Sequence, residues 1–184
     1  MLKLKKNTIL YILALAACFV LGCGISLVLR TIDSREIAPM EGGQPWDLSA
    51  FGLTMRVPDD AVIADHTREN AELGGNALYA GSAQGKDGTL YLFCYENETG
   101  DSLADYPDQD VVTYYMNAGA TSVRTRLLGG RRFICYRAVV LTEEGEQTWD
   151  TYETWDECLQ FSFETQMQPD AVLPILATIE FAKE

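Results

Sequence analysis

The first hydrophobic block of the sequence is a long apolar run without interruption. Residues 7–29 contain no Asp, Glu, Lys or Arg, and as a helix they would extend about 34 Å at 1.5 Å per residue. This length is enough to cross the roughly 30 Å hydrocarbon core of a bilayer. Lys3, Lys5 and Lys6 precede the run, and basic flanks stay on the cytoplasmic side. We therefore predict a single-pass transmembrane signal anchor at 1–30 in the cytoplasmic membrane, with the rest of the chain extracytoplasmic.

Two other forms of processing fit the same segment. The stretch Val20-Leu21-Gly22-Cys23 resembles the lipobox of bacterial lipoproteins, which are cleaved and acylated on the cysteine. A cleaved secretory signal is the third possibility. The apolar run continues through Ile25 to Leu29, where lipoproteins usually become polar, and this favours the anchor. All three alternatives place the following domain outside the membrane.

After the apolar run, residues 31–50 mix charges with Pro39, Gly42, Gly43 and Pro45 and show neither helical nor strand periodicity. Such composition is typical of a linker. We predict a tether over 31–50 and a folded domain over 51–184.

The pattern of the domain then changes to short alternating segments separated by turn residues. Phe51 to Val57 alternates, Pro58-Asp59-Asp60 supplies a turn, and Ala61 to Ile63 follows, which together predict an opening hairpin. Residues 76–83 and 89–95 predict two more strands. Residues 90–95 are apolar on both faces, and this predicts a central strand covered on both sides.

A helix is predicted from Pro107, whose fixed φ suits a first turn, to Gly119, which can cap the end. Four further strands, separated by short turns that favour an antiparallel meander, are predicted at 121–128, 132–141, 147–155 and 159–165. Pro169 begins a last helix, in which Pro174 predicts a kink or a later start. Residues 178–181 predict a closing strand.

Charge is distributed unevenly between the anchor and the domain. After residue 30 the chain has ten Lys and Arg against 27 Asp and Glu, a formal charge of −17. A domain of this charge repels phosphate backbones. We therefore expect no nucleic-acid partner.

Three cysteines, Cys94, Cys135 and Cys158, belong to the domain. Each lies in an apolar run. They are therefore either buried as small hydrophobic residues, or two of the three form one disulfide. His66 is the sole histidine of the sequence, and the cysteine spacings are wide, so no zinc site is predicted. No cofactor is expected.

The order of these elements resembles the family that groups PsbP of photosystem II with Mog1 and many bacterial envelope proteins of unknown role. The matching segments are Phe51 to Pro58, similar to the family's opening motif, and Leu176 to Phe181 after a short helix. The resemblance implies an α+β domain with an antiparallel sheet flanked by helices in an α/β/α sandwich. It also implies a domain that works by binding partners, without naming a partner or a site residue.

Catalytic chemistry finds little support in the residue pattern. A Ser-His-Asp or Cys-His site needs a base beside a nucleophile, and His66 lies in a polar stretch that we interpret as a solvated loop. The acidic segment from Glu96 to Asp110 could bind calcium, although it lacks the EF-hand spacing. With 27 acids in the chain, a carboxylate pair for hydrolysis could also form by chance. We expect no enzyme.

A candidate interaction surface comes from the concentration of arginines and aromatic residues in the predicted meander. Its members are Arg124, Arg126, Arg131, Arg132, Trp149, Tyr152 and Trp155, with Arg137 nearby. Guanidinium groups could bind carboxylates or phosphates of a partner. The alternatives are cross-strand pairing with Asp150 or Glu153 and core packing of the aromatic rings.

The sequence therefore predicts a membrane-anchored, non-catalytic module of the bacterial cell envelope that docks a protein or envelope component. One alternative is a small-ligand or calcium receptor that uses a cleft between helix and sheet. A second alternative is a carboxylate-based hydrolase.

Overall fold

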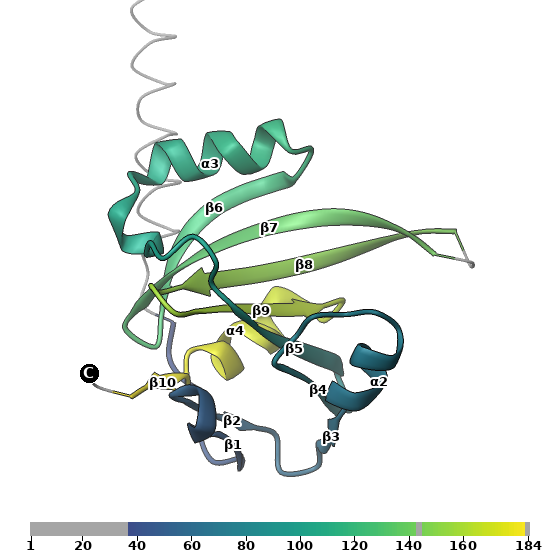
Figure 1. Cartoon of the computed structure of the whole chain (residues 1–184). Coiled ribbons are helices and arrows are strands. Elements are labelled where there is room, and N and C mark those ends of the chain that lie inside the picture. The colour runs from purple at the N-terminus through teal and green to yellow at the C-terminus, as the bar shows by residue number, and fades with distance from the viewer. Residues whose placement is uncertain (1–36, 143–144, 183–184) are drawn as a thin grey trace, which may run out of the picture. The chain divides into compact units, whose positions relative to one another are not determined.

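The computed structural model describes residues 37–142 and 145–182, and its largest element is a twisted antiparallel sheet of seven strands (Figure 1). In spatial order the strands are β3 (Val62–Asp65), β4 (Tyr79–Gly85), β5 (Gly88–Glu96), β9 (Leu159–Thr165), β8 (Gly145–Trp155), β7 (Arg131–Thr142) and β6 (Thr121–Leu128). The strands β6 to β9 are neighbours in chain order. The predicted antiparallel meander is therefore confirmed.

A second, smaller sheet contains β1 (Gln44–Leu48), β2 (Leu53–Val57) and β10 (Glu180–Phe181) in the order β1-β2-β10. Helix α4 (Pro169–Leu176) accompanies it. Helices α2 (Thr67–Glu72) and α3 (Asp108–Asn117) and the 3-10 turns η1 (Ser49–Phe51) and η2 (Leu103–Asp105) complete the described elements.

The main core lies between one face of the seven-stranded sheet and the layer made by the small sheet and α4. The alternation of apolar residues along the strands explains the position of this core, because residues two apart along a strand share a face. Leu92 of β5 and Phe161 and Phe163 of β9 are at most 1% exposed and belong to one cluster with Val57 and Leu176. Burying a side chain of this size contributes about 1.5–3 kcal/mol. This cluster therefore holds the two sheets together.

Helix α3 covers part of the opposite face, next to β6 and β7 (Figure 1). Its buried contact consists of Leu103, Val111 and Ile134, against which Tyr115 and Trp155 pack. This second cluster is much smaller than the main core. The same face therefore retains polar and aromatic side chains beyond the helix.

The predicted opening hairpin is wrong. β2 pairs with β1 and β10, whereas β3 pairs with β4 in the other sheet. The turn after β2, in which the Ala61 N–H donates to the Pro58 carbonyl at 3.0 Å, sends the chain from one sheet to the other.

The structure also differs from the predicted tether over 31–50, because residues 44–48 form β1. Trp46 and Leu48 are 3% and 4% exposed in the main core. The Trp46 indole N–H also donates to the Tyr79 hydroxyl at 3.0 Å. The folded unit therefore begins at Ile37, before the predicted boundary at residue 51.

The fold class is α+β, with antiparallel sheets and three described helices. The resemblance implied a layer of helices on each face of the sheet. On the core side of the seven-stranded sheet, that layer consists partly of the small sheet. α4 begins at Pro169 and contains Pro174, so the predicted later start does not occur. The Pro174 carbonyl instead accepts the Met40 N–H at 2.9 Å.

Cys94 and Cys158 are free cysteines in the structure. Cys94 and Cys135 are buried, as expected for small hydrophobic residues, whereas Cys158 is exposed in the turn between β8 and β9. Within residues 37–142 and 145–182, no helix is both long and apolar enough to cross a membrane. The predicted anchor at 1–30 lies outside the described residues.

Candidate functional site

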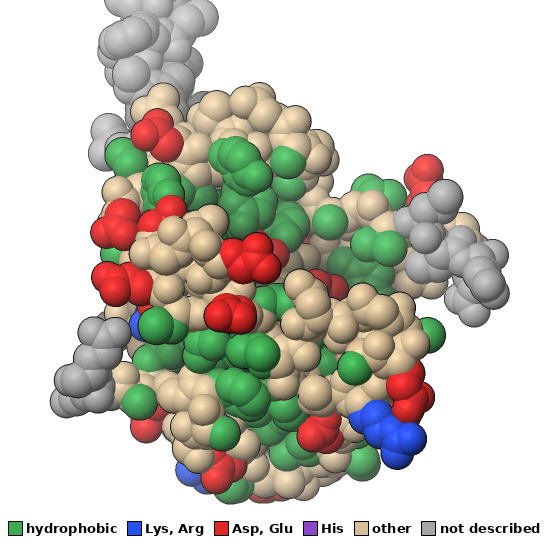
Figure 2. All heavy atoms as spheres, viewed as in Figure 1, with side chains coloured by type: hydrophobic (Ala, Val, Ile, Leu, Met, Phe, Trp, Pro, Cys, Tyr) green, Lys and Arg blue, Asp and Glu red, His purple; other side chains and the backbone are tan. Residues whose placement is uncertain are grey.

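A cleft of about 690 Å³ lies between α3, the segment that precedes it and the end of the seven-stranded sheet. Its lining residues are Asn97, Thr99, Asp101, Tyr106, Asp110, Val111, Tyr114, Tyr115, Trp155 and Gln160. Figure 2 shows apolar side chains gathered around α3 on this side, bordered by acidic ones, with few basic ones in view. We call this feature the α3 cleft.

Helix α3 supplies one wall of the α3 cleft. Pro107 precedes the helix in an extended conformation, and Asp108 and Asp110 in the first turn complement the positive end of its dipole. Val111 faces the sheet and is buried, whereas the Tyr114 side chain is 70% exposed. The rings of Tyr114 and Tyr115 pack edge to face, with their centroids 5.6 Å apart. The helix therefore presents an aromatic pair to the cleft.

Tyr115 connects this wall to a carboxyl group on the sheet. Its hydroxyl donates to Glu153 Oε2 at 2.5 Å, and the Tyr136 hydroxyl donates to Oε1 at 2.8 Å. Burial raises the pKa of Glu153 by more than the hydrogen bonds from Tyr115, Tyr136 and Ser162 lower it. Burial also raises the pKa of both tyrosines.

A second carboxyl group, Glu164, lies on the same face. Ser162 donates to its Oε1 at 3.3 Å, and Ser162 is also the cross-strand neighbour of Glu153. Burial, together with the nearby Glu153 charge, raises the pKa of Glu164. The face of the sheet beside α3 therefore holds two carboxyl groups whose pKa values are raised by burial.

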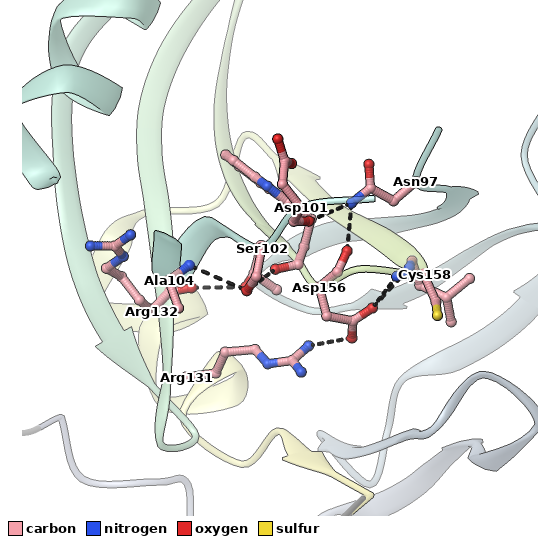
Figure 3. A network of polar contacts seen from close by, with 11 residues as sticks. Asn97, Asp101, Ser102, Ala104, Arg131, Arg132, Asp156 and Cys158 are labelled. Carbon is pink, nitrogen blue, oxygen red and sulfur yellow. Dashed lines mark hydrogen bonds and ion pairs between the residues drawn. The ribbon is translucent and has the colours of Figure 1, made fainter. Parts of the chain in front are cut away.

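The opposite wall of the cleft is the segment between β5 and α3, and a polar network holds it in place (Figure 3). Asn97 donates to the carbonyls of Asp101 and Asp156 at 2.7 and 2.5 Å. Ser102 and Asp105 form a capping box that starts η2, which satisfies two backbone N–H groups reciprocally. The loop that forms this wall is therefore held in place by hydrogen bonds of its side chains.

Asp156 is the centre of this network at the turn between β8 and β9. It accepts from the N–H groups of Cys158 and Leu159 at 3.0 and 2.9 Å and from Arg131 at 3.0 Å. Partial burial alone would raise the pKa of Asp156, but these hydrogen bonds bring it below its usual value. Arg131 also stacks over the ring of Phe181 at 4.0 Å. It therefore joins the two sheets.

Acidic side chains dominate the electrostatics of the cleft. The Tyr106 hydroxyl donates to Asp101 Oδ2, and Thr99 donates to Oδ1 at 2.7 Å. Both hydrogen bonds lower the pKa of Asp101, so this carboxylate is ionised at neutral pH. Among the described residues that line the cleft, none is Lys or Arg. Aromatic faces and carboxylates together attract organic cations.

The structure divides the predicted interaction surface between the two faces of the sheet. Arg124 and Arg126 share the face of Phe133 and Cys135, and Tyr152 is buried in the main core. Trp149 and Trp155 lie on the opposite face, where Trp155 lines the α3 cleft and Trp149 meets Tyr91 edge to face at 5.6 Å.

The remaining arginines make intramolecular ion pairs. Arg132 binds Asp108 at 2.9 Å and the Tyr106 carbonyl at 2.6 Å, which ties the cleft wall to β7. Arg137 forms the expected cross-strand pair with Asp150, with its Nε 2.8 Å from Oδ1. Of the predicted residues, Trp155 thus lines the cleft and Arg132 supports it.

His66, which the sequence predicted to lie in a solvated loop, contacts Ser82 and Glu69 in the structure. His66 Nε2 lies 2.9 Å from Ser82 Oγ, and its Nδ1 lies 3.1 Å from Glu69 Oε2. The residues after His66 form α2. From the sequence, Ser82 stands out only as a polar residue between the small residues Gly81 and Ala83. Its contact with His66 depends on the pairing of β3 with β4, which local sequence does not reveal.

The layers described above define a PsbP-like fold, so the resemblance expected from the sequence is confirmed at the level of the fold. The structure is similar to the solution structure of cyanobacterial PsbP (CyanoP) from Synechocystis sp. PCC 6803, with a TM-score of 0.52 and 12% identity over 80% of this chain and 97% of that chain.

A crystal structure from Bacteroides thetaiotaomicron is similar as well, with a TM-score of 0.50 and 14% identity over 77% of this chain. The match spans 49% of that protein, about half of its length. No family model and no curated protein matches the sequence. At these identities the likeness concerns the fold alone.

Proposed function

We propose that this chain is a membrane-anchored extracytoplasmic binding module whose α3 cleft receives a positively charged segment of a partner protein. The observation that carries the proposal is the lining of the cleft, where Tyr106, Tyr114 and Trp155 stand beside Asp101 and Asp110 without a basic residue among the described lining residues. Cations bind aromatic faces with about 0.5–2 kcal/mol, depending on desolvation.

Two further features support a binding role for the cleft. Its volume of about 690 Å³ lies within the range of about 300–1,000 Å³ that ligand sites have. Its walls are tied to the sheet by Arg132 and by Asn97, so little ordering is needed on binding. A preformed site reduces the entropic cost of association.

Location outside the cytoplasmic membrane is part of the proposal and rests on the apolar run at 7–29 and the three lysines before it. Cys158 provides a test because it is exposed in the domain. In intact cells, a membrane-impermeant maleimide should label Cys158 of the full-length chain, and Cys158→Ser should lose that label. Labelling that requires cell lysis would place the domain inside.

The test of the cleft is calorimetric titration of the full-length chain with a Lys/Arg-rich decapeptide, and with a Glu-rich peptide of equal length. We expect binding of the cationic peptide alone. Asp101→Asn combined with Asp110→Asn should weaken it several-fold, and added salt should weaken it further because exposed charges are screened.

The matched control is Asp59→Asn combined with Asp87→Asn, which removes the same charge from turns that do not line the cleft. Equal weakening by both double variants would mean that net charge alone attracts the peptide. That result would reject the cleft as the binding site.

A further inference from the structure

A second cleft, of about 470 Å³, lies between α2 and the edge formed by β3, β4 and β5. His66, Glu69, Asn70 and Ser82 line it together with apolar side chains. None of its lining residues belongs to the α3 cleft. Whatever it does is therefore separate from the proposed partner binding.

Three side chains in this cleft form a continuous relay. Ser82 Oγ lies 2.9 Å from His66 Nε2, and His66 Nδ1 lies 3.1 Å from Glu69 Oε2. A carboxylate can only accept a hydrogen bond, so Nδ1 carries the imidazole proton. In the neutral imidazole, Nε2 is then the acceptor for the Ser82 hydroxyl. This is the order of contacts that activates a serine in hydrolases of unrelated folds.

The relay joins firmly placed elements. Ser82 is the central residue of β4, paired with Ala64 on one side and Tyr91 on the other. The His66 N–H donates to the Ala80 carbonyl at 2.7 Å, and the Thr67 hydroxyl accepts the Ala80 N–H at 3.1 Å. The base and the nucleophile are therefore positioned by the hydrogen bonds of His66 and Thr67 to the backbone of Ala80 in β4.

We infer that this cleft is a hydrolytic site for carboxylic esters, with Ser82 as nucleophile and His66 as general base. Ser82 Oγ attacks the ester carbonyl carbon while its proton passes to His66 Nε2. The carbonyl–alkoxy bond then breaks, and the Nε2 proton leaves with the alcohol. Water, deprotonated by the same nitrogen, cleaves the acyl-serine. The sum is ester plus water to acid plus alcohol.

The surroundings of Ser82 fit this chemistry. The Asn70 carboxamide makes no hydrogen bond within the described residues, and its Oδ1 is buried. An oxyanion on the carbonyl oxygen needs a donor, a role open to the Nδ2 amide of Asn70 because this residue lines the same cleft, and one such donor contributes about 10²–10³-fold to turnover. Val62, Leu73 and Phe93 also line the cleft, alongside Gln84 and Thr89, and their apolar side chains favour an ester with an apolar acyl group.

Glu69 acts as a positioning residue, since it orients the imidazole through Nδ1. Its side chain is 74% exposed, and a solvated carboxylate holds its partner less strongly than a buried one. We therefore expect Glu69→Gln to slow acylation only several-fold without preventing it. Glu69→Asp should restore part of the rate, which a merely structural role would not produce.

The test is covalent labelling of the purified full-length chain with a biotinylated fluorophosphonate, with the modified residue mapped by mass spectrometry. We expect one adduct, on Ser82, and slow release of nitrophenol from p-nitrophenyl butyrate. His66→Gln should reduce the rate of Ser82 labelling and the rate of nitrophenol release by about 10²–10⁴-fold each, which is the contribution of a positioned base. Circular dichroism of each variant shows whether it is folded.

Ser82→Ala removes the hydroxyl alone and serves as the background. Ser162→Ala is the matched control, because Ser162 is equally buried but contacts Glu164 instead of His66, and it should retain the adduct on Ser82. Absence of an adduct on Ser82 in the folded wild-type chain would overturn the inference. An adduct of equal rate in folded His66→Gln would overturn it as well.

Discussion

The two faces of the seven-stranded sheet differ although they are built from the same strands. On one face, Leu92 and Phe163 face each other in a closed apolar core. The next residue pair along β5 and β9 is Phe93 and Ser162, whose side chains lie on the other face of the sheet. Ser162 contacts the half-buried Glu164 there. Both proposed sites lie on this second face. The first face determines the fold, and the second leaves polar groups in place for binding and chemistry.

The largest difference between the faces should appear in the free energy of unfolding. Phe163→Ala opens a cavity in the core, where Phe163 is 0% exposed, and should lower the free energy of unfolding by about 3–5 kcal/mol. Phe93→Ala removes the same side chain from the other face, where it stacks on Tyr95 at 6.2 Å, and should cost about 1 kcal/mol. Urea denaturation of both variants measures the difference. Equal losses would mean that the second face is also a closed core.

A smaller effect is expected at the turn that supports the α3 cleft. Asp156→Ala removes the acceptor of three hydrogen bonds and should lower the free energy of unfolding by about 1–2 kcal/mol. The folded-state pKa of Asp156 is lowered, so its contribution is present above the unfolded pKa. It is lost as pH falls through the folded pKa. The difference between wild type and variant should therefore shrink in acid, and a difference that grows in acid would contradict the network.

The opposite pH dependence is expected for Glu153. Its folded-state pKa is raised by burial, so its contribution is greatest below the unfolded pKa and is lost as pH rises through the folded pKa. Glu153→Gln should therefore raise the free energy of unfolding at neutral pH, by about 0.5–2 kcal/mol as for other single stabilising substitutions. Urea denaturation at several pH values tests this. A variant that is less stable at neutral pH would show that the charged form is favoured in the fold.

The smallest effect is expected in the reactivity of the cysteine thiols, which can be compared without changing the fold. Burial raises the pKa of the Cys94 thiol to about 12, and thiolates are the reactive form. Cys158 is exposed. Native chain should therefore react with a maleimide at Cys158 long before it reacts at Cys94 or Cys135, as peptide mapping will show. Comparable rates at Cys94 would mean that the core face opens readily.

Local patterns predicted much of the fold but little of the candidate sites. Alternation and short turns were sufficient for β6 to β9, since each strand pairs with its neighbour in sequence. β1 was missed because it is short and contains Pro45. The pairing of β2 with β10 near residue 180 is long-range, and no local pattern indicates it. The same limit hid the contact of Tyr115 with Glu153, which are 38 positions apart. Trp155 was named because an aromatic residue in a polar strand is visible locally.

The most direct test of the proposed partner binding is crosslinking in living cells that express the full-length chain. A photoreactive benzoylphenylalanine replaces Tyr114 in the α3 cleft or, as a matched control, Val139 at the far end of β7. These side chains are 70% and 61% exposed. We expect a crosslink from position 114 that maps to a Lys/Arg-rich segment of an extracytoplasmic partner, and none from position 139. Crosslinks of equal yield from both positions would contradict the proposed partner binding. A crosslink from position 114 to a segment without basic residues would contradict it as well.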